Sequence, residues 1–184
     1  MILPIYVYGQ PVLRKETTDI TPDYPQLKEL IANMFETMEY ADGVGLAAPQ
    51  IGLDIRLLVV GLDALSDEFP EYKGFKKAYI NAHIVEVSEE ECSMEEGCLS
   101  LPGLHESVKR PKSIRLQYMD ENFIAQDEWI DGFLARVLQH EIDHLDGMLF
   151  FDHLSGLRKK MIRSKLNNMV DGKVRCSYKI KTFR

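Results

Sequence analysis

Two histidines and a glutamate in this chain have the spacing of a metal-dependent hydrolase. The segment reads His140-Glu141-Ile142-Asp143-His144. On an α-helix, residues four apart lie on the same face one turn apart, so both imidazoles can reach a single divalent ion. Glu141, next to the first histidine, could accept a proton from water that this ion activates. The pattern also occurs in chains that bind no metal, so it needs support from other residues.

A catalytic metal site usually takes three ligands from the protein and leaves another position for water. The known HExxH protease patterns find their third ligand downstream. No glutamate follows Glu141 in this chain, and Phe150 stands where the extended pattern HExxHxxGxxH has its third histidine, although Gly147 matches the glycine. We therefore expect the third ligand to come from upstream.

Cys98 is our candidate for that ligand. Gly97 precedes it and a Pro-Gly turn follows, which is typical of a short extended segment between turns. Cys92 lies in an acidic run and is expected to be solvated, and Cys176 lies in a basic tail. Three cysteines without a CxxC pair argue against a disulfide framework or a structural zinc site. A single cysteine is more often a small buried apolar residue, but two histidines that lack a third partner favour the ligand interpretation.

A third segment, Gly-Val-Gly-Leu-Ala-Ala-Pro-Gln at residues 43–50, is rich in small side chains. Gly43 and Gly45 would let the backbone approach a ligand closely. Gln50 offers an uncharged amide donor that could stabilise an oxyanion. The alternative is a glycine-rich turn before a strand, with Gln50 as an ordinary surface amide.

Together, GVGLAAPQ, EGCLSLPG and HEIDH resemble, in this order, the three signature motifs of the bacterial peptide deformylases, over roughly residues 2–170. The resemblance implies that Cys98, His140 and His144 are metal ligands and that Glu141 is the general acid/base. It further implies an oxyanion site formed by Gln50 and the backbone N–H of Leu99, and a substrate backbone held by Gly45.

The resemblance also implies the activity. The family consists of metallo-amidohydrolases that remove the formyl group, as formate, from the N-terminal formyl-methionine of newly made polypeptides. One divalent ion per chain is expected, Fe(II) first, with zinc, nickel or cobalt as alternatives. Formyl-methionyl nascent peptides would be the substrates, with transient contact to the ribosome, and the enzyme is expected to be a monomer.

Such an enzyme needs an apolar pocket for methionine and an edge that pairs with an extended peptide. We expect the segment 43–45 to provide this edge. The expected pocket residues are Val44, Phe133, Val137 and the stem of Arg136, and Gly97 is expected to bind the substrate as well. The family has an apolar residue at the position of Arg136, so we expect its methylenes to line the pocket while its guanidinium stays in water. The apolar members could equally be ordinary core residues.

Composition agrees with a single compact domain of residues 1–184, in which 170–184 form a C-terminal tail. The hydrophobic content of 45% can build a core, and the net charge of −7 argues against a DNA-binding protein. No apolar run is long enough to cross a bilayer and the N-terminus does not resemble a signal peptide, so we expect a cytoplasmic protein. One predicted helix carries a basic group that is either a solvated face or a contact for ribosomal RNA: Arg158, Lys159, Lys160, Arg163 and Lys165.

The predicted fold class is α+β, with mixed or antiparallel sheets around a central metal-binding helix and with an N-terminal and a C-terminal helix. The metal-binding helix should cover 133–145, with Asp131 as N-cap and Gly147 as its stop. Residues 62–77 look like a mobile insertion loop. Helices are also predicted from Thr21-Pro22 to Met38 and over 157–169, and strands over 55–60, 78–87, 114–118 and 123–130.

Two other classes of function remain open at this point. A metalloprotease of internal peptide bonds would lack its downstream ligand. A metal-binding module without catalysis, such as a sensor, would have no use for Glu141 as a general base.

Overall fold

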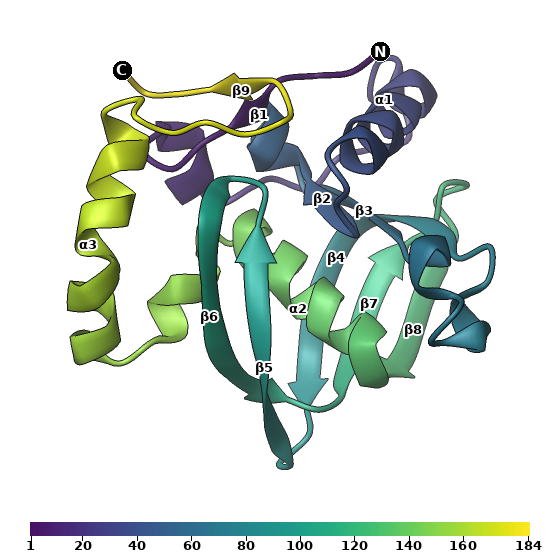
Figure 1. Ribbon diagram of the computed structural model, residues 1–184. Helices are drawn as coiled ribbons and strands as arrows, with labels where there is room; N and C mark the ends of the chain where they lie inside the picture. The colour runs from purple at the N-terminus through teal and green to yellow at the C-terminus, as the bar shows by residue number, and fades with distance from the viewer.

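The computed structural model covers residues 1–184 and has an α+β architecture (Figure 1). A five-stranded antiparallel sheet has the order β2-β3-β4-β7-β8, a second sheet is the hairpin β5–β6, and β1 pairs in parallel with β9. The strands are β1 (Ile5–Tyr6), β2 (Gly45–Ala47), β3 (Leu57–Gly61), β4 (Lys76–Val87), β5 (Glu91–Cys98), β6 (Leu101–Pro111), β7 (Ile114–Met119), β8 (Ala125–Ile130) and β9 (Ile180–Lys181). The α-helices are α1 (Leu27–Tyr40), α2 (Gly132–Leu145) and α3 (Gly156–Val170).

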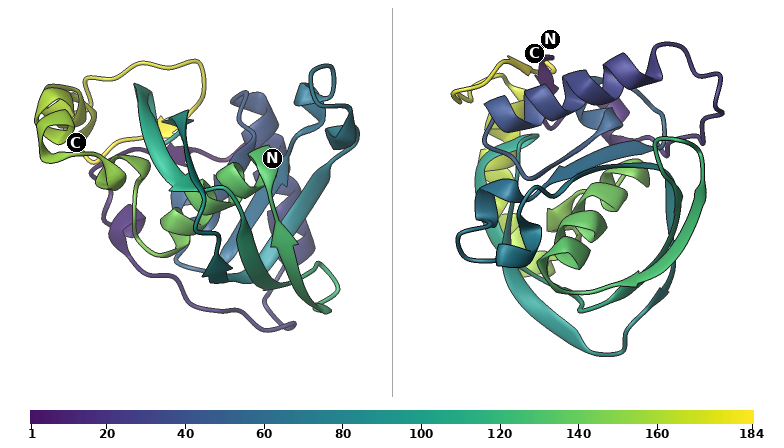
Figure 2. Two further views of the ribbon diagram at one scale, coloured as in Figure 1. Left: turned by 90° about the horizontal axis from the view of Figure 1, so that it is seen from below. Right: turned by 90° about the vertical axis from the view of Figure 1, so that its right-hand side faces the viewer.

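Strand β3 is buried on both faces because a helix covers each side of the large sheet. Leu58 and Val60 pack with residues of α2, whereas Leu57 and Val59 pack with residues of α1. Successive side chains of a strand point to opposite faces, so an uninterrupted apolar run is expected for a strand between two layers. The views in Figures 1 and 2 show α2 between the large sheet and the β5–β6 hairpin, and α1 on the other face of the sheet.

The predicted metal-binding helix is confirmed as α2. Its residues Ala135, Leu138, Ile142 and Leu145 recur at helical spacing and face the core. Asp131 occupies the N-cap position, but its side chain makes no capping hydrogen bond.

Gly147 ends α2 as predicted, with a φ of +72° that favours glycine. A β-carbon at this position would lie 2.8 Å from the backbone oxygen of Arg14. The chain therefore turns away directly after the second histidine.

The N-terminal helix begins later than predicted. Residues 21–26 form turns, and α1 starts at Leu27 after Gln26, whose φ of 55° is left-handed. Pro25 disfavours the helical conformation for the residue before it, which explains why the Thr21-Pro22 start was wrong. The predicted apolar positions Ile31, Met34 and Met38 are buried.

The long β5–β6 hairpin was not predicted as a pair of strands. Buried positions alternate along β6, but Glu106 and Arg110 occupy two of them. These polar residues hide the period-two hydrophobic pattern that indicates a strand. The short extended piece expected around Cys98 is in fact the end of an eight-residue strand.

Residues 62–77 connect β3 to β4 and most of them are exposed, as expected of a surface loop, but several contacts attach the segment to the core. It contains two short 3₁₀ helices, and the Tyr72 hydroxyl accepts a hydrogen bond of 3.2 Å from the backbone N–H of Leu134 in α2. Phe75 and Leu65 pack against the core.

The C-terminal helix is confirmed as α3, which Ser155 caps by accepting a hydrogen bond from the Arg158 N–H. Ile162, Leu166 and Met169 pack against β6, while the basic residues predicted on this helix are exposed. The chain has no helix of the length and apolarity that a membrane crossing requires.

Candidate metal centre and active site

The fold brings the three predicted ligands together. One donor atom each from Cys98, His140 and His144 lies within 4.8 Å of the others. The sulfur of Cys98 is 3.2 Å from Nε2 of His144, and the two imidazole centroids are 5.3 Å apart. One sulfur and two nitrogens suit zinc, iron, nickel or cobalt, so these residues fit a divalent transition metal.

Phe150, which replaces the downstream histidine of the extended protease pattern, packs on a ligand instead. It is buried, and its ring stacks on His140 at 5.7 Å with an interplanar angle of 25°. The downstream segment therefore contributes an apolar wall to the site, and the third ligand comes from β5.

Glu96 orients the first histidine. Its Oε1 lies 2.8 Å from Nδ1 of His140, which leaves Nε2 of that ring for the metal. Arg110 and Arg136 donate to the same carboxylate at 2.7 and 2.8 Å. Burial opposes ionisation of Glu96, but hydrogen bonds from His140 and Arg110 outweigh it and hold the pKa of this carboxyl well below its ordinary value.

Glu141 lies beside the cluster, and one of its carboxylate oxygens is available to accept a proton. The residue is 4% exposed, and its Oε2 has no hydrogen-bond partner. Burial raises the pKa of Glu141 to about 7 in the metal-free protein. A carboxyl group with a pKa near neutrality is suited to both accepting and donating a proton.

Gly45 is small because Glu141 occupies the adjacent space. A β-carbon on Gly45 would lie 2.6 Å from Oε1 of Glu141. A glycine is therefore needed at position 45 to leave room for the Glu141 carboxylate, and not only for a substrate.

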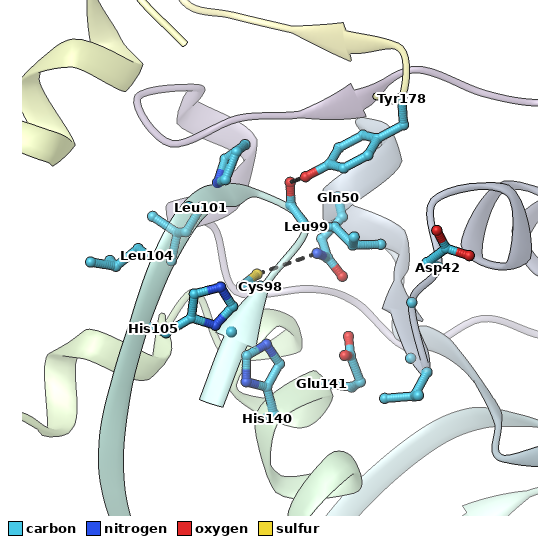
Figure 3. A pocket seen from close by; sticks show the side chains of 16 residues that line it. Asp42, Gln50, Cys98, Leu99, Leu101, Leu104, His105, His140, Glu141 and Tyr178 are labelled. Atoms are coloured by element: carbon cyan, nitrogen blue, oxygen red, sulfur yellow. Dashed lines mark hydrogen bonds between the residues drawn. The ribbon is translucent and has the colours of Figure 1, made fainter. Parts of the chain in front are cut away.

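Gln50 is buried, so its description as an ordinary surface amide is excluded. Its Oε1 accepts a hydrogen bond of 2.9 Å from the Ala47 N–H, which directs its amide nitrogen toward Ser100 Oγ at 3.2 Å. The same nitrogen lies 3.6 Å from the sulfur of Cys98 (Figure 3). The N–H of Leu99, in the turn after Cys98, has no acceptor within the chain. Two donors thus lie next to the metal ligands.

Two strand edges face the cavity that contains these groups. β2 is the edge strand of the large sheet, and β5 pairs with β6 on one side only. The Val44 oxygen accepts from the Gly61 N–H toward β3, so alternation directs the backbone groups of Gly45 to the open edge. The cavity has a volume of about 320 Å³, and Gly43, Gly97 and His105 also line it.

A smaller cavity of about 130 Å³ adjoins the metal cluster. It is lined by all four predicted pocket residues, Val44, Phe133, Arg136 and Val137, and also by Gly97. Glu95 and Glu96 also contribute, so the wall is not purely apolar.

Arg136 lines the pocket as predicted, but the prediction that its guanidinium stays in water was wrong. Its guanidinium is buried, where it donates to Glu96 and, at 2.8 Å each, to the carbonyls of Val108 and Cys92. The group is buried because these three acceptors replace its hydration. Arg136 thereby connects α2 to both strands of the hairpin.

The other two cysteines lie outside the cluster. Cys92 is half-buried next to Arg136 rather than solvated, and Cys176 is half-buried in the tail, where its thiol donates to the Tyr178 carbonyl.

Three residues at the site received no role from the sequence. Glu96 could have been found, because it is two residues before Cys98 in a strand and therefore points to the same face. His105 lies opposite Gly97 on β6, and Tyr178 reaches the cavity from the C-terminal tail. No local pattern marks either of them.

Comparison with known proteins gives one consistent family. The sequence model of the family described as polypeptide deformylase matches residues 2–160. The chain is 51% identical to a peptide deformylase of Flavobacterium johnsoniae, covering 98% of this chain and 96% of the relative, and 50% identical to one of Salinibacter ruber, covering 99% and 95%. Its fold matches the crystal structure of a peptide deformylase from Legionella pneumophila with a TM-score of 0.81 at 37% identity, covering 96% of this chain and 99% of that one.

Proposed function

Because the chain belongs to the peptide deformylase family, which removes the N-formyl group from nascent peptides, we propose that the residues around Cys98 carry out this hydrolysis in the following roles. The observation that supports these roles best is the buried Glu141 beside a Cys-His-His cluster. Cys98, His140 and His144 hold the ion.

A formamide carbonyl is a weak electrophile, so the reaction needs electrostatic help. When bound, the divalent ion supplies positive charge that polarises the formyl carbonyl and lowers the pKa of the attacking water. Glu96 keeps His140 in the tautomer that presents Nε2 to the site. Phe150 and the apolar face of α2 exclude bulk water.

Glu141 moves the proton. Its unpartnered Oε2 accepts a proton from the attacking water and then donates it to the nitrogen of the leaving amine. The C–N bond breaks, and the products are formate and a free N-terminus. Burial holds the pKa of Glu141 above its ordinary value, which brings this carboxyl group closer to neutrality and lets it serve as base and then as acid.

The Gln50 amide and the Leu99 N–H stabilise the oxyanion that forms at the formyl carbon. Both donors are fixed before the substrate arrives, Gln50 by the Ala47 N–H and Leu99 by its place in a tight turn. Donors that need no reorganisation contribute most to this kind of catalysis.

The substrate binds as an extended strand between the β2 and β5 edges. Gly43 and Gly45 on one side and Gly97 on the other allow its backbone to come close. Such pairing reads the main chain, so many second residues are tolerated. The methionine side chain enters the 130 Å³ cavity, where Arg110 and Arg136 neutralise the charge of Glu96.

We propose Fe(II) as the native ion, with zinc, nickel or cobalt as functional substitutes. Thiolate and imidazole ligands suit all four, so the donor set does not select among them. Metal analysis of anaerobically purified protein tests this choice, and full occupancy by zinc alone would contradict it.

Formyl-Met-Ala-Ser and its unformylated form test the roles together. We expect formate release from the first and no cleavage of the second. Cleavage of an internal bond would instead support a metalloprotease, and metal-loaded protein inactive on both would support a binding module.

The exposed basic face of α3 is proposed to contact ribosomal RNA transiently, with the cytoplasm as the site of action. Arg158 is paired with Glu106, while Lys159, Lys160, Arg163 and Lys165 have no ion-pair partner. Co-sedimentation with ribosomes should weaken as salt rises, and a salt-independent interaction would argue against this face.

A further inference from the structure

The C-terminal tail returns to the body of the protein after α3 ends at Val170. It joins the N-terminal segment through backbone bonds from Ile5 N–H to the Lys179 carbonyl, 2.9 Å, and from Val7 N–H to the Lys181 carbonyl, 3.0 Å. The tail lies outside residues 2–160, to which the family model extends. It is therefore a fixed part of this fold rather than a free extension.

Tyr178 is the residue of the tail that lines the active-site cavity. Its hydroxyl donates a hydrogen bond of 2.7 Å to the carbonyl oxygen of Leu99, and its ring lines the cavity that contains Cys98 and Glu141 (Figure 3). Burial raises the pKa of Tyr178 well above its ordinary value, so the hydroxyl keeps its proton and remains a donor.

The turn that Tyr178 contacts is Leu99-Ser100, which connects β5 to β6. The Ser100 carbonyl accepts from the Tyr8 N–H at 2.9 Å, and Ser100 Oγ accepts from the Gln50 amide at 3.2 Å. The Leu99 carbonyl depends on Tyr178 for its partner within the chain. These three acceptors of the turn are thus held, while the Leu99 N–H stays free.

We propose that Tyr178 is a positioning residue, which fixes the Leu99-Ser100 turn so that the Leu99 N–H points at the oxyanion. This inference rests on the proposed role of that N–H. The Leu99 carbonyl and the Leu99 N–H lie in adjacent peptide planes that φ and ψ of Leu99 relate to each other, so a bond that holds the carbonyl restricts the orientation of the N–H. Without the hydroxyl, water replaces it and the turn gains freedom.

The effect should appear in turnover rather than in substrate binding. Complete loss of an oxyanion donor costs about 10²–10³-fold in kcat. A donor that is present but less well directed should cost less, about tenfold, with KM changed by less than about twofold.

Tyr178→Phe tests the proposal because it removes only the hydroxyl and keeps the ring. Tyr6→Phe is the matched control, since the Tyr6 hydroxyl accepts from Lys181 at 3.2 Å and so belongs to the same tail contact without touching Leu99. Zinc-loaded proteins are compared by kcat, KM, metal content, thermal unfolding and the amide resonance of Leu99.

The proposal predicts that Tyr178→Phe lowers kcat and shifts the Leu99 resonance while metal content stays at one equivalent, and that Tyr6→Phe does neither. Unchanged kcat and an unchanged resonance would overturn the positioning role and leave the proposed mechanism intact. A shifted resonance with unchanged kcat would overturn both this inference and the oxyanion role of Leu99. Equal losses of kcat in the two variants would show that the tail only stabilises the fold, and would refute the proposal.

Discussion

Replacing Gly45 with alanine is the sharpest test of where Glu141 must lie. The backbone of Gly45 is not left-handed, so alanine is compatible with its conformation. The added β-carbon would lie 2.6, 2.8 and 2.9 Å from Oε1, Cγ and Cδ of Glu141. Because three atoms are too close, rotation of the carboxylate alone does not relieve the clash.

The required displacement follows from these contacts. Ordinary van der Waals contact begins at 3.4 Å, so the carboxylate oxygen has to move by 3.4 − 2.6 = 0.8 Å. A misplacement of about 1 Å in a catalytic group can cost about 10²-fold in rate. We therefore expect Gly45→Ala to lower kcat by about 10²-fold, with a loss of about 1–3 kcal/mol in unfolding free energy from overpacking.

Formate release from formyl-Met-Ala-Ser, with metal analysis of the same samples, measures the effect. Metal content should remain at one equivalent because no ligand is touched. Gly156→Ala is the control: nothing lies within 4 Å of its β-carbon, and it should leave kcat unchanged.

A double-mutant cycle with Glu141→Gln decides whether the clash acts through Glu141. If it does, Gly45→Ala should cost little more kcat in the Glu141→Gln background, because both changes disable one group. Retention of kcat within about threefold in the single variant, or full additivity in the cycle, would refute the reasoning.

Glu141→Gln should keep one equivalent of metal and lower kcat by about 10²–10⁴-fold, since an amide cannot accept the proton; near-normal turnover would remove Glu141 from the mechanism. Cys98→Ala should lose tight metal binding, whereas Cys92→Ala and Cys176→Ala should retain metal content, and the opposite result would show that the ligand assignment is wrong. Glu96→Gln should weaken metal binding about 10–100-fold; it should also reduce the loss of stability on acidification, because a carboxyl with a depressed pKa stabilises the fold above its unfolded pKa and loses that contribution as pH falls. The acid limb of kcat/KM should lie below pH 7, because burial raises the pKa of Glu141 to about 7 and a bound cation lowers it again; a limb above pH 7 would contradict this assignment.

Helical spacing determined much of the metal site from the sequence. Positions four apart on a helix must share a face, so His140 and His144 had to lie together once α2 formed. The missing downstream ligand, with Phe150 in its place, left the upstream cysteines, and Cys98 is the one that the fold brings together with the two histidines. The α+β class and the apolar faces of α1 and α3 were predictable for the same reason, because local periodicity specifies a helix face.

Tertiary structure decided which side chains from distant segments meet. Arg136 and Glu96 are 40 positions apart, and Tyr178 and Leu99 are 79 apart. Nothing local indicated that the guanidinium of Arg136 would be buried, since its burial depends on carbonyls supplied by a hairpin whose alternation is masked by Glu106 and Arg110. Spacing along the chain fixes neighbours within one element, whereas contacts between elements depend on how those elements pack, and so the metal ligands could be read from the sequence while the groups that hold and orient them could not.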